Sequence, residues 1–194
     1  MSVALTVPDV MTLTAFLAWD APLGVAWQLV DGVPVAMAPT SPTHGTIQAE
    51  LGGLLRDHLR AAGNRCRVVA NPGVIPRVGS NNNFRIPDLR VTCEPIRRDD
   101  AALRKPVLLV QILSPSNRGE TWTNVWAFTT IPSLSEILVV RTEAIGCLLL
   151  RRGHDGTWPE NPTEIGDGDL TLSSIGFATP VGALYAGTWL AAAG

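Results

Sequence analysis

Apolar residues fall in short runs along the chain, and one of these runs contains a single amide. Val107–Leu113 is apolar except for Gln111, and it lies between Pro106 and the turn-forming residues 114–117. Such a run predicts a strand that is buried on both faces of a sheet. Because an unpaired buried polar group costs about 1–3 kcal/mol, Gln111 either has a partner in the core or faces a functional site.

Helical periodicity predicts two longer helices. Apolar residues recur at helical spacing over 42–62, and Gly63 follows as a C-terminal cap. A second helix is expected over 118–130, with Asn117 as its N-cap and Glu120 at the spacing of a capping box. A shorter amphipathic helix is expected over 10–19.

Several short runs predict strands. Asp31-Gly32 between two apolar runs is a strong signal for a two-residue β-hairpin. Strands are expected over 25–30, 33–37, 67–70, 74–78, 85–92, 107–113, 137–141 and 147–152. The predicted fold class is therefore α/β (α+β), a central mixed sheet flanked by helices, and the absence of a long linker predicts a single domain over 1–194.

Composition adds three expectations. The chain of 194 residues is 46% hydrophobic and only 16% charged, so we expect a second copy to cover part of its surface in a homodimer. No run approaches the about 18–20 apolar residues of a membrane span. The net charge of −2 gives no general attraction to nucleic acid, so DNA binding would require a local basic face.

The cysteines and the first residues predict a cytoplasmic protein. Cys66, Cys93 and Cys147 are widely spaced and suggest neither a disulfide set nor a metal-ligand pair, which favours a reducing compartment. The segment 1–22 has no basic region ahead of its apolar residues and does not resemble a signal peptide.

Asp88 and Gln111 form the main candidate site. Asp88 follows Pro87 at the start of a predicted strand, and Gln111 lies in the buried strand that follows. Adjacent strands would bring both side chains to one edge of the sheet, beside the loop 114–117. Two carboxylates at these positions would bind Mg²⁺, which prefers oxygen ligands and retains several waters.

The motifs in this order resemble the PD-(D/E)XK nuclease superfamily, specifically a family of inferred restriction endonucleases that is common in cyanobacteria and other bacteria. The matching pieces are Trp27–Gly32, Met37–Pro39, Ser41-Pro42 with His44, Pro87-Asp88, Val110–Ser116, and Ile131–Leu134 with Glu136. The resemblance implies a restriction-endonuclease-like core and Mg²⁺-dependent hydrolysis of DNA phosphodiesters.

Three positions depart from the family pattern. The aspartate is present as Asp88, but Gln111 stands where the family usually has glutamate, Asn124 where it usually has lysine, and Gln28 where it has an acid. Lys105 is the only lysine in the chain, and at about 3.3 Å per strand residue it would lie roughly 20 Å from Gln111. The implied Mg²⁺ site is therefore degenerate, with weak or absent binding.

The resemblance assigns Asp88, Gln111 and Asn124 to catalysis, with Asp88 and Gln111 as metal ligands. Gln28, Arg118, Ser114 and Ser116 are candidates for substrate binding, and Glu50 or Glu120 could replace the missing acid. His44 lies on the apolar stripe of its helix, which predicts a packed histidine. Arginines cluster in sequence around Asp88 and could face phosphate: Arg77, Arg85, Arg90, Arg97, Arg98 and Arg104.

Two functions remain open from the sequence. One is a Mg²⁺-dependent DNA endonuclease with a degenerate metal site, weakly active or inactive. The other is a non-catalytic binding or scaffold protein with a nuclease fold that acts as a homodimer.

Overall fold

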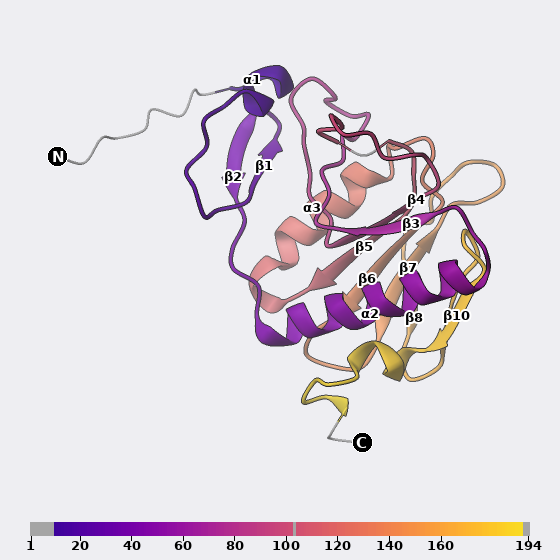
Figure 1. The fold of residues 1–194 in the computed structure, drawn as a ribbon. Coiled ribbons are helices and arrows are strands. Elements are labelled where there is room, and N and C mark those ends of the chain that lie inside the picture. Colours follow the sequence, from indigo (N-terminus) through magenta and orange to yellow (C-terminus); the bar gives the residue numbers. More distant parts are fainter. Residues whose placement is uncertain (1–9, 103, 192–194) are drawn as a thin grey trace.

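The centre of the fold is a mixed sheet (Figure 1). Among residues 10–102 and 104–191, which this computed structural model describes, it has six strands in the order β3-β4-β5-β6-β7-β8. β5 and β6 pair in parallel, and the other neighbours are antiparallel. The strands are β3 (Arg67–Ala70), β4 (Leu89–Thr92), β5 (Pro106–Leu113), β6 (Glu136–Arg141), β7 (Cys147–Arg151) and β8 (Thr163–Ile165).

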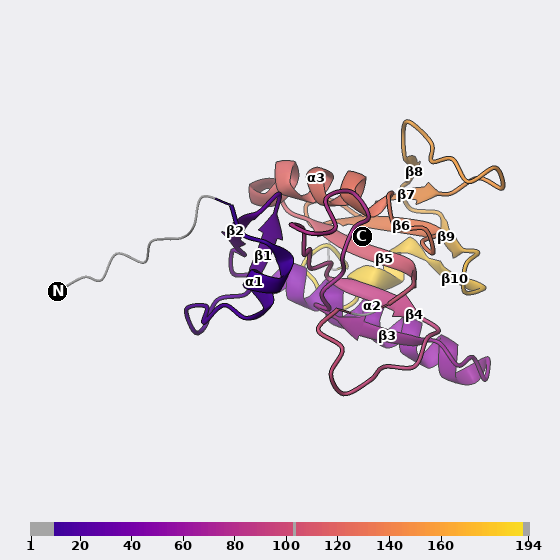
Figure 2. The ribbon, with the colours of Figure 1, turned by 90° about the horizontal axis from the view of Figure 1, so that it is seen from above.

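Two helices cover opposite faces of this sheet (Figure 2). Helix α2 (Pro42–Ala61) packs its buried stripe, which includes Ile47 and Leu51, against alternate residues of β4–β7. Helix α3 (Arg118–Phe128) packs Val125 and Phe128 against the other face. The expected α/β (α+β) class, with a mixed sheet flanked by helices, is confirmed.

β5 is buried on both faces, as predicted, because it lies between α2 and α3. Leu108, Val110 and Ile112 belong to the core beneath α2, whereas Leu109 and Leu113 belong to the core beneath α3. The strand alternation therefore directs Gln111 toward the α3 side of the sheet.

The smaller elements lie around this core. The hairpin predicted at Asp31-Gly32 is present, and both residues have positive φ values of 49° and 85°. The smaller helices and strands are α1 (Leu13–Leu17), β1 (Trp27–Val30), β2 (Val33–Ala36), the 3₁₀ helix η1 (Pro115–Asn117), β9 (Asp169–Leu172), β10 (Phe177–Pro180) and the 3₁₀ helix η2 (Val181–Tyr185).

The strands expected between residues 74 and 92 are shorter in the structure. Val74 and Arg85 form only an isolated bridge, and β4 starts after Pro87. Pro76 and Pro87 have no N–H to donate to a ladder, which limits regular pairing in this segment.

Asn117 is the N-cap residue of α3, as predicted, but its side chain makes no capping hydrogen bond to this helix. Its Oδ1 instead accepts a hydrogen bond from the backbone N–H of Ser114 at 2.8 Å. Glu120 does not complete a capping box, because its Oε1 accepts a hydrogen bond from Gln28 Nε2.

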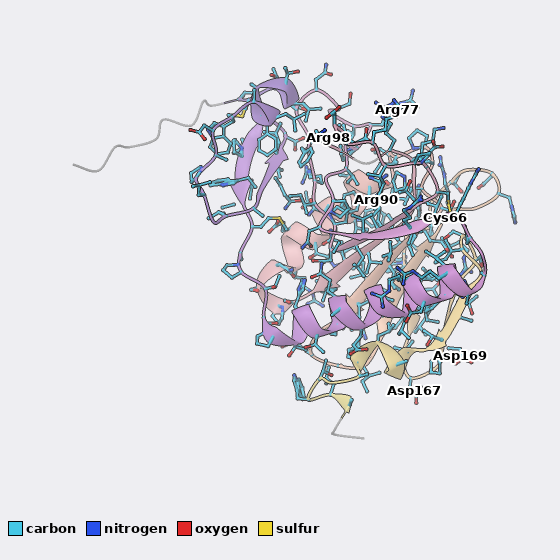
Figure 3. The ribbon with its side chains drawn as sticks, in the orientation of Figure 1. Cys66, Arg77, Arg90, Arg98, Asp167 and Asp169 are labelled. Atoms are coloured by element: carbon cyan, nitrogen blue, oxygen red, sulfur yellow. A yellow bond between two sulfur atoms is a disulfide. The ribbon has the colours of Figure 1, made fainter. Side chains whose placement is uncertain are left out.

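The expectation that the cysteines stay unpaired is also wrong. Cys66 and Cys93 form a disulfide across a sequence separation of 27 residues (Figure 3). The β3–β4 register pairs Arg67 with Thr92, so the antiparallel ladder brings the two flanking cysteines opposite one another. The cysteines therefore no longer argue for a reducing compartment. In the described residues, no helix is long and apolar enough to span a membrane.

Candidate active site

Asp88 is held by two hydrogen bonds to its carboxylate. Oδ1 lies 2.8 Å from His44 Nε2, and Oδ2 accepts the backbone N–H of Ile112 at 2.6 Å. The second bond arises because β4 begins at Leu89, opposite Val110, so the Ile112 amide lies beyond the last paired residue of β4. Each carboxylate oxygen therefore already accepts one hydrogen bond from the protein.

His44 reaches Asp88 from the first turn of α2. Ser41 caps this helix by accepting the His44 backbone N–H on its Oγ at 3.2 Å. The His44 side chain is buried, with the residue 4% exposed. The predicted position on the buried side of the helix is confirmed. The contact with Asp88, 44 residues away in sequence, was missed because it depends on how α2 lies across the sheet.

Gln28 joins several elements at the pocket wall. It is fully buried on β1, and its Nε2 donates to Glu120 Oε1 on α3 at 2.6 Å. Its Oε1 accepts the backbone N–H of Ile86 at 2.9 Å and Asn124 Nδ2 at 3.3 Å. Gln28 and Asn124 therefore contact each other. Their amides are already used in hydrogen bonds to other residues of the same chain.

A buried arginine holds the side chain of Asn124 in place. Arg85 Nη1 donates to Asn124 Oδ1 at 2.8 Å, and its Nε and Nη2 donate to Asn83 Oδ1. Burial lowers the pKa of the Arg85 guanidinium, and the charges of Asp31 and Glu120 partly offset this effect. Arg85 therefore holds Asn83 and Asn124 through its guanidinium, which is not free to face phosphate.

Gln111 differs from the other amides. It is 5% exposed, and its Nε2 makes no hydrogen bond to any residue that the structure describes. Because buried polar groups are almost always paired, the Gln111 Nε2 donor is available to a water or a ligand in the cavity that Gln111 lines.

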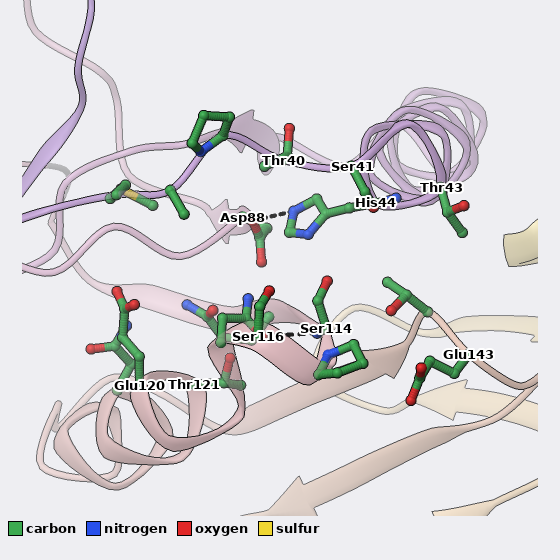
Figure 4. Close-up of a pocket in the computed structure, with 18 of the residues that line it drawn as sticks. Thr40, Ser41, Thr43, His44, Asp88, Ser114, Ser116, Glu120, Thr121 and Glu143 are labelled. Atoms are coloured by element: carbon green, nitrogen blue, oxygen red, sulfur yellow. Dashed lines mark hydrogen bonds and ion pairs between the residues drawn. The ribbon is translucent and has the colours of Figure 1, made fainter.

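A cavity of about 470 Å³ is lined by residues that include Gln28, His44, Asp88, Gln111 and Asn124, whereas Arg85 lies outside this lining. Figure 4 shows Asp88 and His44 on one side, with Ser114 and Ser116 across from them. The sequence-predicted residues that line it are Gln28, Asp88, Gln111, Ser114, Ser116, Glu120 and Asn124. The volume suits a small ligand or one residue of a polymer.

Two predicted residues lie elsewhere. The described residues that line the cavity do not include Arg118, which is exposed at the start of α3, or Glu50, which is half-buried on α2. Lys105 does not line the cavity either, and its Nζ pairs with Glu94 Oε1 at 3.2 Å. Trp189 lines the cavity and is 59% exposed. No motif in the sequence pointed to it, since it lies in the tail after η2.

The arginines expected to face phosphate divide into two groups. Arg85 and Arg90 are buried, and Arg90 donates to the backbone carbonyl of Arg104. Burial lowers the Arg90 pKa to about 10. Arg77 and Arg98, labelled in Figure 3, are exposed, as are Arg97 and Arg104.

A different arginine cluster lies at the far end of α2. A second depression there is lined by four exposed arginines: Arg56, Arg60, Arg65 and Arg67. A third depression follows α2 through Gly45 and Ala49 and shares Arg56 and Val68 with the second. The second and third depressions therefore adjoin one another along α2.

The residues present do not fit a magnesium ion well. Among the described residues, no group of three His, Cys, Asp or Glu side chains is placed to hold a metal ion. Both Asp88 oxygens already accept a hydrogen bond, Gln111 offers at most one neutral oxygen, and Glu120 accepts a hydrogen bond from Gln28. Mg²⁺ is usually held by one or two carboxylates in near-octahedral geometry, so this donor set lacks its main ligands.

The fold is a mixed sheet between two helices, with Asp88 beside Gln111 of the buried central strand. The chain belongs to the Uma2 family, described as "Putative restriction endonuclease", which matches residues 13–181. It is 28% identical over 174 residues to the uncharacterized protein slr1290 of the cyanobacterium Synechocystis, covering 89% of this chain and 90% of that protein.

A solved structure has the same fold. The crystal structure of a putative nuclease belonging to DUF820 from Anabaena variabilis superimposes with a TM-score of 0.73 at 14% sequence identity. The match covers 90% of this chain and 97% of the other. The resemblance inferred from the sequence motifs is therefore confirmed at the level of family and fold.

Proposed function

We propose that this chain binds DNA at the Asp88 cavity and has lost most or all Mg²⁺-dependent cleavage. The observation that carries the proposal is the pair Asp88 and Gln111. A nuclease of this type needs carboxylates there, but Gln111 is neutral and both Asp88 oxygens accept protein hydrogen bonds. The hydrogen bonds from His44 and the Ile112 amide already use part of the acceptor capacity of Asp88, which leaves less of it for a metal ion.

Charge and aromatic residues support binding to a nucleic-acid strand. The depression lined by Arg56, Arg60, Arg65 and Arg67 supplies the local basic face that the net charge of −2 makes necessary. Trp189 at the cavity offers an exposed ring on which a base can stack, an interaction worth about 1–3 kcal/mol.

The test compares nicking of supercoiled plasmid in Mg²⁺ and in Mn²⁺ by wild type, Asp88→Ala and Gln111→Glu. Asn161→Asp is the matched control, because it adds the same negative charge at an exposed position outside both the cavity and the arginine depression. We expect little or no cutting by wild type and a gain in Gln111→Glu. At equilibrium, Gln111→Glu should also bind Mn²⁺ more tightly than wild type does.

Efficient wild-type cleavage that requires the metal and is abolished by Asp88→Ala would contradict the degenerate-site proposal. Such a result would mean that a neutral amide is tolerated as a ligand. DNA binding is measured separately by fluorescence anisotropy, so that loss of cutting is not confused with loss of binding.

A second candidate is the non-catalytic scaffold that acts as a homodimer. Trp126 favours it, since this residue is 43% exposed on α3 and its ring lies 6.3 Å from that of Trp122. Covering these rings would bury apolar surface. Light scattering should then give the mass of a dimer for wild type and of a monomer for Trp126→Glu; a monomeric wild type would exclude this candidate.

A further inference from the structure

His44 and Asp88 form a pair that the degenerate-metal proposal does not use. We propose that His44 is the general base of a metal-independent cleavage of ribose-containing strands, with Asp88 orienting its ring. The inference rests on the proposed binding of a nucleic-acid strand at this cavity, and it adds a substrate class, RNA, and a chemical step.

Hydrogen bonding fixes which nitrogen of His44 can act. The ionised Asp88 carboxylate accepts a hydrogen bond on Oδ1, so in the neutral ring the proton lies on Nε2, 2.8 Å away. Nδ1 then carries the lone pair, and it makes no hydrogen bond to any described residue. Figure 4 shows that this edge of the ring faces the cavity on the side of Ser114. A carboxylate that holds an imidazole by one nitrogen leaves the other as a base.

Gln111 supplies the second part of the site. Its Nε2 is a hydrogen-bond donor without a partner among the described residues, and Gln111 lines the same cavity as His44. A neutral amide is a weaker metal ligand than a carboxylate, but it can donate to an oxygen on which negative charge develops. Glutamine in place of glutamate at position 111 therefore weakens metal binding but provides a hydrogen-bond donor for an anionic phosphate oxygen.

RNA is the substrate that such a site can cleave. Its 2′-hydroxyl is an internal nucleophile beside the phosphorus, so a base alone can activate it, whereas DNA has no such group. His44 Nδ1 takes the 2′-hydroxyl proton as the bond from O2′ to phosphorus forms. The bond from phosphorus to O5′ breaks, the departing O5′ takes a proton from solvent water, and His44 returns its proton to solvent. The products are a 2′,3′-cyclic phosphate and a 5′-hydroxyl.

The experiment uses two oligonucleotides of one sequence, all-DNA and DNA with a single ribonucleotide, in excess EDTA. Wild type should cut only the strand with the ribonucleotide and leave a 2′,3′-cyclic phosphate. His44→Ala should lower the rate about 10²- to 10⁴-fold, the usual contribution of a general base. Added imidazole should restore part of this loss. His44→Gln is the second variant in case the alanine variant does not fold.

His58→Ala is the matched control. His58 lies on the same helix but outside the cavity, where its Nε2 contacts the Ile175 carbonyl at 3.0 Å. Its substitution should leave the EDTA-resistant rate unchanged. Equal cutting by wild type and both His44 variants would overturn the inference, because the activity would then have another source.

The binding measurement separates this inference from the proposed function. Fluorescence anisotropy that reports binding of both strands, without cleavage of the ribonucleotide strand, would overturn the His44 inference and leave the DNA-binding proposal standing. Failure to bind either strand would overturn both.

Discussion

Replacing Asp88 tests whether its carboxylate is held as described. Asp88→Asn keeps the shape of the side chain but removes the charge, whereas Asp88→Ala removes both acceptors. In wild type, the carboxylate accepts His44 Nε2 and the Ile112 amide at 2.8 and 2.6 Å, and the residue is 6% exposed. The two variants therefore differ in how many buried donors lose their acceptor.

The magnitudes follow from these two bonds. A hydrogen bond to a charged group contributes about 1.5–3 kcal/mol and a neutral one about 0.5–1.5 kcal/mol. The asparagine side chain of Asp88→Asn keeps one acceptor oxygen for the Ile112 amide and presents its NH2 to His44 Nε2, which can accept it once the ring proton moves to Nδ1. Both contacts then become neutral in Asp88→Asn, so the free energy of unfolding should fall by about 2 kcal/mol. Asp88→Ala leaves the Ile112 amide and His44 Nε2 unpaired, at about 1–3 kcal/mol each, which gives a fall of about 4 kcal/mol.

Urea denaturation followed by tryptophan fluorescence measures both values. With a slope of about 2 kcal/mol per molar urea, Asp88→Ala should lower the midpoint by about 2 M and Asp88→Asn by about 1 M. The control is Asp57→Asn, since Asp57 is exposed and its ion pair with Arg56 should contribute less than about 1 kcal/mol. If Asp88→Asn and Asp88→Ala were equally destabilised, or if neither differed from the control, the two hydrogen bonds would not be the cause.

Three further outcomes are expected. Arg60→Ala with Arg65→Ala should weaken DNA binding and reduce the slope of log affinity against log salt by about 2, because two phosphates would no longer be neutralised by arginine; an unchanged slope would place the DNA elsewhere. Tyr185, the only tyrosine, is buried, which raises its pKa to about 12. Because the unfolded phenol ionises near pH 10, the free energy of unfolding should fall between about pH 10 and 12. Absorbance at about 295 nm should show a single titration of the phenol with a midpoint near pH 12. A midpoint near pH 10, as in the unfolded chain, would contradict the burial of Tyr185. Cys66→Ser with Cys93→Ser should lower the free energy of unfolding by about 3 kcal/mol in urea denaturation, as expected for a loop of this length, and should abolish any effect of reductant.

The sequence predicted the elements well where one periodicity extended over many residues. The apolar run of β5 and the stripe of α2 each have one stable arrangement, because a slip would expose their apolar side chains. The nearness of Asp88 and Gln111 followed from the adjacency of their strands and from the family resemblance. Gln28 and Glu120 also line the cavity, as both had been assigned to it.

Contacts set by tertiary packing could not be predicted in the same way. The pair His44–Asp88 depends on the angle at which α2 crosses the sheet, and no local pattern encodes this angle. The occupation of Asp88 by the Ile112 amide depends on the exact residue at which β4 begins. Trp189 reaches the cavity only because the tail after η2 returns to this end of the molecule.

The length of α2 sets a natural scale for any strand that this surface recognises. His44 is in its first turn and Arg60 near its end, so 16 residues separate them. At about 1.5 Å per residue this distance is about 24 Å. With about 3.4 Å between successive stacked nucleotides, a stacked strand that reaches both must cover about seven of them. Shorter stacked oligonucleotides can occupy the cavity or the arginine cluster, but not both at once.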